Sequence, residues 1–162
     1  MMLQRILILS VVLLAGCGFQ LRGQNVLPPA LYQMSVHTNA PYNRFAKTLK
    51  QRLILLGVQP SLGNRTLLSV KEEKLAEREV TIDTTNQVKV YTYTYSITYS
   101  LTVNGKLLID NRNISMARPL MLAPSARTET DNQRDFIVQE LERNVVSQLI
   151  NQLHSTPIGP RQ

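Results

Sequence analysis

Cys17, the only cysteine of the 162-residue chain, is the residue whose surroundings point most directly to covalent chemistry. It ends the stretch Leu-Ala-Gly-Cys (14–17), which follows an apolar run at 6–14, and Arg5 is the only charged side chain before it. The run has the length of a signal-peptide core and is well short of the roughly 20 residues that span a bilayer. We therefore predict that residues 1–16 are a removable leader; the alternative is a buried cysteine behind an uncleaved apolar segment.

Residues 14–17 resemble the bacterial lipobox, whose small residues before the cysteine fit a narrow peptidase groove. The resemblance implies that Cys17 receives a diacylglyceryl group through a thioether bond and becomes the acylated N-terminus. The next residue is Gly18, whereas aspartate at this position is the usual signal for retention in the inner membrane among similar lipoproteins. We therefore expect the chain to be anchored by lipid in the outer membrane, on its periplasmic side.

No other residue pattern predicts catalysis or a metal site. The two histidines, His37 and His154, have no serine, cysteine or carboxylate partner at motif spacing. The sequence has neither a glycine-rich phosphate loop nor cysteine and histidine pairs at metal-ligand spacing. We therefore expect a protein that is not an enzyme and that carries no cofactor.

The charge balance indicates an anionic partner. Removal of residues 1–16 leaves 146 residues with 17 basic and 11 acidic side chains, a net charge of +6 when the histidines are neutral. Phospholipid headgroups, a phosphorylated glycolipid or nucleic acid all fit this charge, and export from the cytoplasm argues against nucleic acid. With Cys17 acylated no thiol remains for a disulfide, so one hydrophobic core must hold the single domain together.

The first part of the mature chain reads as a tether, a strand and a helix. Residues 17–30, with Pro28 and Pro29 near their end, predict an extended tether, and residues 31–38 alternate like a short strand. A helix is expected from Pro41 to Leu56, with a face that is basic and lacks any acidic residue. Its predicted core positions are Tyr42, Phe45, Ala46, Leu49, Leu53 and Leu56.

Two long strands follow. Residues 66–82 predict a strand whose charged middle is either a sheet edge or projects past the core. Residues 88–103 give the clearest alternation in the chain, with tyrosine and aliphatic residues at odd positions. The even positions carry small hydroxyls only, namely Thr92, Thr94, Ser96, Thr98, Ser100 and Thr102.

A two-residue type I′ turn at Asn104 and Gly105 predicts a hairpin with a returning strand that Pro119 ends or places at an edge. The turn would pair Val103 with Lys106. The same register pairs Leu101 with Leu108, Tyr95 with Ile114 and Tyr93 with Met116, apolar with apolar, which supports the turn. It leaves Tyr99 opposite Asp110 and Ile97 opposite Arg112 as imperfect pairs.

A capping box at 130–133 predicts a second helix to about Leu153, followed by a short tail at 155–162. Its expected core stripe is Phe136, Ile137, Leu141, Val145, Leu149 and Leu153. The element order is β-α-β-β-β-α. We predict an α+β fold, a two-layer sandwich in which two helices pack on a mostly antiparallel four-stranded sheet, with one domain at 31–154.

The mature start, Cys-Gly-Phe-Gln-Leu-Arg-Gly (17–23), resembles that of the LPS-assembly lipoprotein LptE family. The run at 131–141 is similar to the beginning of the second helix in that family, and the predicted element order is that of the family as well. The resemblance implies a partner and plug of the LptD outer-membrane β-barrel. Such a protein supports assembly of the barrel and binds lipopolysaccharide during its delivery to the outer leaflet. The alternative is a free-standing, periplasm-facing lipoprotein that binds or inhibits another anionic ligand or enzyme.

Two groups of residues are candidates for these contacts. The six hydroxyl residues between Thr92 and Thr102 offer a smooth face for a polar barrel lining, unless the face is simply exposed to solvent. Five basic residues are candidates for lipopolysaccharide phosphates: Lys71, Lys74, Arg78, Lys89 and Arg127. Glutamates interspersed among the first three favour local ion pairs as the alternative reading. The basic helix face has a similar alternative, a solvated surface.

Overall fold

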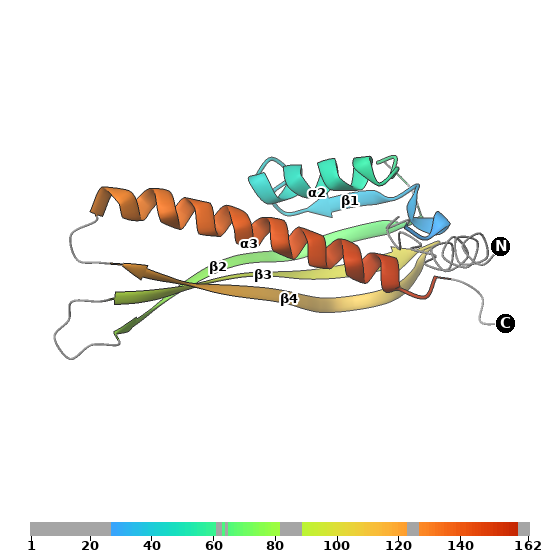
Figure 1. The fold of residues 1–162 in the computed structure, drawn as a ribbon. Coiled ribbons are helices and arrows are strands. Elements are labelled where there is room, and N and C mark those ends of the chain that lie inside the picture. The colour runs from blue at the N-terminus through green and yellow to red at the C-terminus, as the bar shows by residue number, and fades with distance from the viewer. Residues whose placement is uncertain (1–26, 61–62, 64, 82–88, 123–126, 159–162) are drawn as a thin grey trace, which may run out of the picture.

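The computed structural model describes residues 27–60, 63, 65–81, 89–122 and 127–158 (Figure 1). Cys17 and the predicted leader and most of the tether lie outside these residues. The described elements are a short 3₁₀ helix η1 (Pro29–Leu31), β1 (Ser35–Thr38), α2 (Arg44–Leu55), β2 (Leu67–Thr81), β3 (Lys89–Val103), β4 (Lys106–Leu122) and α3 (Arg127–Ser155). The predicted α+β order is confirmed.

The four strands form one sheet in the order β1-β2-β3-β4. β1 pairs with β2 in parallel, over Ser35–Thr38 and Leu67–Val70, and the other pairings are antiparallel. A parallel pair needs a crossover between its strands, which α2 provides, whereas β3 and β4 need only a tight turn. Because β1 is so short, β2 from Lys71 onward is a sheet edge, and its alternating charges suit that position.

Both helices lie on one side of the sheet, as Figure 1 shows, and bury the odd-numbered face of β3. That face supplies Tyr93, Tyr95, Ile97, Tyr99, Leu101 and Val103 to the core. α3 is 29 residues long and follows the length of the sheet, about 44 Å at 1.5 Å per residue. α2 has 12 residues, so it covers only the end of the sheet near β1. The other half of the sheet is covered by α3 alone.

Three element boundaries differ from the sequence predictions. The strand expected at 31–38 is limited to Ser35–Thr38, because Pro28 and Pro29 start η1 instead. α2 begins at Arg44 with Asn43 as its N-cap, whose side chain accepts a hydrogen bond from the Ala46 N–H, rather than at Pro41. α3 begins at Arg127, before the capping box expected at 130–133.

The register predicted for the β3–β4 hairpin is wrong beyond its first two pairs. Val103 lies opposite Lys106 and Thr102 opposite Leu107, but Leu101 pairs with Ile109, Tyr95 with Met116 and Tyr93 with Arg118. Irregularities between Tyr99 and Thr102 shift the register by two residues, and Asn111 has a φ of +46° there. The shift places Ile97 opposite Ile114 and Tyr99 opposite Arg112, so only one of the two expected pairs with a charged residue is removed.

Two predicted core residues are exposed. Phe136 is 60% exposed, whereas the next residue of α3, Ile137, is buried, so Phe136 lies outside the buried stripe of the helix. Tyr42 is 86% exposed because α2 starts two residues after it and its side chain precedes the buried stripe.

Candidate functional site

The even-numbered face of β3 lies on the side of the sheet opposite both helices. Thr92, Thr94, Ser96, Thr98 and Thr102 are each half-buried there, between neighbouring strands. The face continues onto β4, where Ser96 pairs with Ser115, Thr94 with Ala117 and Thr98 with Asn113. These two strands therefore present small, uncharged side chains from Thr92 to Thr98, and we call this surface the open face.

Ser100 has a different role from the other five hydroxyls. It is buried, and its Oγ accepts a hydrogen bond from the Asn111 N–H at 3.1 Å and lies 3.2 Å from Asp110 Oδ1. Lys71 Nζ is 2.7 Å from Asn111 Oδ1 and 3.3 Å from Asp110 Oδ1. Ser100 thus holds the β4 bulge in place, so it is much less available for a partner.

The five basic candidates lie in different surroundings in the structure. Lys71 is engaged with the β4 bulge, as described above. Lys74 and Arg78 are exposed, and they pair with Ser96 and Thr92, so they border the open face. Lys89 is the first residue of β3 and lies opposite Leu122, the last residue of β4.

Arg127 is the first residue of α3. The side chains of Lys89 and Arg127 are outside the described part, as is Cys17. The backbone nevertheless brings the start of β3, the end of β4 and the start of α3 to one end of the molecule (Figure 1).

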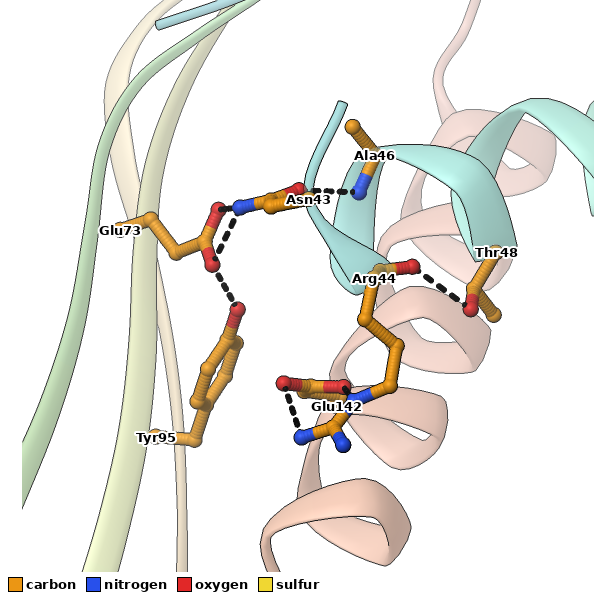
Figure 2. Close-up of polar contacts among 7 residues, drawn as sticks. All are labelled: Asn43, Arg44, Ala46, Thr48, Glu73, Tyr95 and Glu142. Carbon is orange, nitrogen blue, oxygen red and sulfur yellow. Dashed lines mark hydrogen bonds and ion pairs between the residues drawn. The ribbon is translucent and has the colours of Figure 1, made fainter. Parts of the chain in front are cut away.

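A polar cluster that the sequence analysis did not predict joins α2 to the sheet. The Glu73 carboxylate accepts hydrogen bonds from Asn43 Nδ2, at 2.8 and 2.9 Å, and from the Tyr95 hydroxyl at 2.5 Å (Figure 2). Burial, together with this bond to a carboxylate, raises the pKa of Tyr95 far above its ordinary value of 10.0. The cluster therefore fixes the N-terminus of α2 over β2 and β3.

A second unpredicted contact joins the two helices. Arg44 Nε donates to Glu142 Oε2 at 2.5 Å, and the second guanidinium nitrogen Nη2 donates to Oε1 at 2.9 Å (Figure 2). Hydrogen bonding to Glu142 raises the pKa of Arg44. Glu142 is buried within the apolar stripe of α3, between Leu141 and Val145. In the sequence, the only sign of this contact is a glutamate within the apolar stripe of a predicted helix, because a buried carboxylate needs a cationic partner.

Residues of α3 and β4 line an open groove of about 520 Å³ in the half of the sheet that α2 does not cover. Its lining combines exposed apolar side chains with the ion pair between Arg118 and Glu140. The lining residues are Arg118, Pro119, Leu120, Asn132, Gln133, Phe136, Ile137 and Glu140. The sequence pattern does not indicate this groove, because Phe136 fits the periodicity of the predicted core stripe of the helix.

Among the described residues, no group of three or more histidine, cysteine, aspartate or glutamate side chains is placed to hold a metal ion. The described part also contains no helix that is both long and apolar enough to cross a membrane. The exposed features of the described part are the open face, its basic border and the groove.

The family model LptE, described as lipopolysaccharide-assembly, matches residues 33–153. The chain belongs to the LptE family. The match runs from just before β1 to the end of the core of α3, so it includes every element that forms the open face. The fold of this LptE-family lipoprotein is accordingly the one that the sequence resemblance implied.

Two curated relatives align along most of this LptE-family chain. It is 24% identical to the LPS-assembly lipoprotein LptE of Pectobacterium atrosepticum, over 90% of this chain and 80% of the relative. It is 28% identical to the LPS-assembly lipoprotein LptE of Yersinia enterocolitica, over 86% of this chain and 65% of the relative.

Solved structures share the fold at low sequence identity. The rare lipoprotein B of Shewanella oneidensis superposes with a TM-score of 0.71 at 17% identity, covering 78% of this chain and 96% of that one. The lipoprotein B of Nitrosomonas europaea gives a TM-score of 0.70 at 14% identity, covering 85% and 91%. The two-layer sandwich is therefore common to these lipoproteins.

Proposed function

We propose that this LptE-family chain is a non-enzymatic outer-membrane lipoprotein, acylated on Cys17, that plugs an LptD-type β-barrel. In this role it supports assembly of the barrel and binds lipopolysaccharide during its delivery to the outer leaflet. Membership of the family supports the role in lipopolysaccharide assembly. The barrel contact rests on the open face, and the lipid contact rests on the basic side chains beside it.

The open face is the observation that carries the proposed barrel contact. Solvent-exposed strands usually bear lysine and glutamate, which aid solubility and discourage unwanted pairing. On β3 and β4 the residues from Thr92 to Thr98 and from Asn113 to Ala117 carry no charge on this side. Short hydroxyl side chains let a polar barrel lining approach closely and exchange hydrogen bonds with it. A long charged side chain would hold such a partner away.

The proposed lipopolysaccharide contact has two parts. Lys74 and Arg78 lie on one side of β2, about 13 Å apart along the strand, and can each meet a phosphate at the border of the open face. Lys89 and Arg127 belong to the end of the molecule where β3 and α3 begin. Lys71 is the weakest of the five candidates because the bulge in β4 already engages it.

The test of the barrel contact is a substitution that adds bulk and charge to the open face. Thr94→Arg changes a half-exposed residue whose side chain points away from the helix-covered core, so the domain should stay folded by circular dichroism. The variant should lose co-purification with the barrel in detergent, because it would bury an unpaired charge in the contact. Thr94→Ser, which keeps the hydroxyl, is the matched control and should co-purify normally.

The result separates the proposed role from the alternative of a free-standing lipoprotein. A folded Thr94→Arg protein that recovers the barrel at the yield of the Thr94→Ser control would show that the open face is a solvent surface. Failure of the unmodified chain to recover any barrel would reject the plug role itself.

A further inference from the structure

Three stretches of the sequence that contain no acidic residue meet at one end of the described structure. The sequence has no aspartate or glutamate in residues 1–71, 84–109 or 143–162. These stretches supply η1, β1, α2, the β3–β4 turn and the C-terminal part of α3, which gather at one end in Figure 1. We call this the proximal end, because the described chain begins there at Leu27. The nearest carboxylate along β4 is Asp110, which Lys71 and Ser100 engage.

Backbone contacts hold these distant stretches together. The Gln59 N–H donates to the Tyr32 carbonyl at 2.8 Å, which ties the chain after α2 to the chain after η1. The Gly105 N–H donates to the Arg65 carbonyl at 3.0 Å, which ties the hairpin turn to the start of β2. Arg65 and Lys106 lie at or next to the second contact, and Arg52 is in the last turn of α2, so these three exposed cations belong to the stretches that meet at the proximal end.

Exposed aliphatic side chains accompany these cations. Leu55 is 82% exposed and Ile54 is 56% exposed in the last turn of α2. Leu107 at the start of β4 is 52% exposed, and with Leu67 it flanks Thr102 across the sheet. Leucines beside arginine and lysine, with no acidic residue among them, are the composition of surfaces that lie in the interface of an anionic membrane.

The length of chain outside the structure fits a membrane rather than another partner. Nine residues lie between Cys17 and Leu27, and the ten residue-to-residue steps span at most about 35 Å. Leu27 is buried in the core, so a lipid on Cys17 would keep the proximal end within that distance of the bilayer. A second copy of the chain would bring the same cations together and repel them.

We propose that the proximal end docks on the phospholipid bilayer that holds the anchor, with Leu55 and Leu107 in the interfacial layer and Arg52, Arg65 and Lys106 on anionic headgroups. The position of the bilayer rests on the proposed acylation of Cys17, while the lipid-binding surface does not. Docking of this kind orients the open face relative to the membrane and adds a second attachment to the acyl chains.

The experiment uses the mature chain with Cys17→Ser, so that no acyl group contributes. This substitution lies outside the described core, and circular dichroism checks folding. Flotation with phosphatidylcholine vesicles, with and without phosphatidylglycerol, measures binding. We expect binding to the mixed vesicles only, and weaker binding as salt rises.

Matched variants locate the surface. Arg52→Gln/Lys106→Gln should weaken binding to the mixed vesicles by roughly 25-fold, about fivefold for each cation. Arg118→Gln/Arg134→Gln removes the same charge at positions outside the acid-free stretches and should change binding little. Leu55→Gln should weaken binding at every salt concentration, whereas Met121→Gln, another exposed apolar position, should not.

Equal binding to both kinds of vesicle, or equal losses from the two pairs of charge variants, would overturn the proposal. Because these proteins are not acylated and no barrel is present, neither result depends on the proposed anchor or plug. A failed anchor would appear separately, as an unmodified Cys17 in the mass of the mature protein.

Discussion

Arg44 and Glu142 are 98 residues apart in the sequence and form a two-point ion pair, with distances of 2.5 and 2.9 Å. The Glu142 side chain is 9% exposed and that of Arg44 is 47% exposed, so the pair is buried on the acid side only. It is the contact that joins the N-terminus of α2 to the middle of α3 (Figure 2). It acts at the same end of α2 as the contact between Asn43 and Glu73.

Arg44→Ala should lower the free energy of unfolding by about 1–3 kcal/mol, because the Glu142 carboxylate would stay buried without its partner. Urea denaturation followed by circular dichroism measures this change. Lys47→Ala, at an exposed position one turn along α2, is the control and should change stability by less than about 0.5 kcal/mol. Equal effects of the two substitutions would mean that the pair adds nothing to stability.

Stability should fall in alkali because the pKa of Tyr95 is raised in the folded state. Below pH 10 the tyrosine is protonated in both states, and the benefit of its bond to Glu73 is complete. Above pH 10 the unfolded chain loses this proton while the folded chain keeps it, so stability decreases as pH rises. Burial raises the pKa of Tyr93 and Tyr99 as well, in the same direction.

Tyr95→Phe should therefore flatten the decrease of unfolding free energy between pH 10 and pH 11, by at most about 1.4 kcal/mol per pH unit. At neutral pH the same variant should lose about 1 kcal/mol, the usual net value of a hydrogen bond. Urea titrations at several pH values measure both effects. A slope in alkali identical to that of the unmodified protein would show that the Tyr95 proton is not linked to folding.

Ser100 and Ser96 should respond differently to loss of their hydroxyls. Ser100→Ala removes the acceptor of the Asn111 N–H and should cost about 1–2 kcal/mol of stability. Ser96→Ala, on the open face, should cost little stability and act on barrel association instead. Thermal unfolding and co-purification of both variants check the division. If Ser100→Ala is as stable as Ser96→Ala, the bulge does not need Ser100.

Lipopolysaccharide binding should depend on Lys74 and Arg78. Changing both to glutamine should weaken binding at low salt, and the loss should shrink as salt rises, because screening acts over about 8 Å at physiological ionic strength. Lys47→Gln/Arg143→Gln removes the same charge from the helix side and serves as the control. Binding to dephosphorylated lipid A should be weak for every protein. Equal binding with and without phosphates would contradict an electrostatic contact.

Acylation at Cys17 should be visible in the mass of the mature protein, which should begin at this residue. Burial of acyl CH₂ groups at about 0.8 kcal/mol each makes anchoring by several chains effectively permanent. Gly18→Asp should move the protein to the inner membrane in fractionation experiments, while Gly18→Ser should not. An outer-membrane location for the aspartate variant would show that residue 18 does not direct sorting.

The sequence alone determined the elements and their order, because the patterns involved are local. Alternation along β3, a 3.6-residue period in the two helices and a two-residue turn at Asn104 and Gly105 each specify conformation within a few residues. The same alternation placed tyrosines on one face of β3 and hydroxyls on the other, and burial in the structure follows that division except at Ser100.

Only the tertiary structure decided which of these side chains are exposed and which are engaged in contacts within the fold. The bulge near Asn111 shifts the β3–β4 register and turns Ser100 into an internal support, since its partners come from another strand. Phe136 lies outside the buried stripe of α3, and packing brings Arg44 to Glu142 and Asn43 to Glu73. The proximal end likewise combines residues from three separate stretches of the sequence. A local sequence pattern cannot show such contacts, because they depend on how distant segments pack against one another.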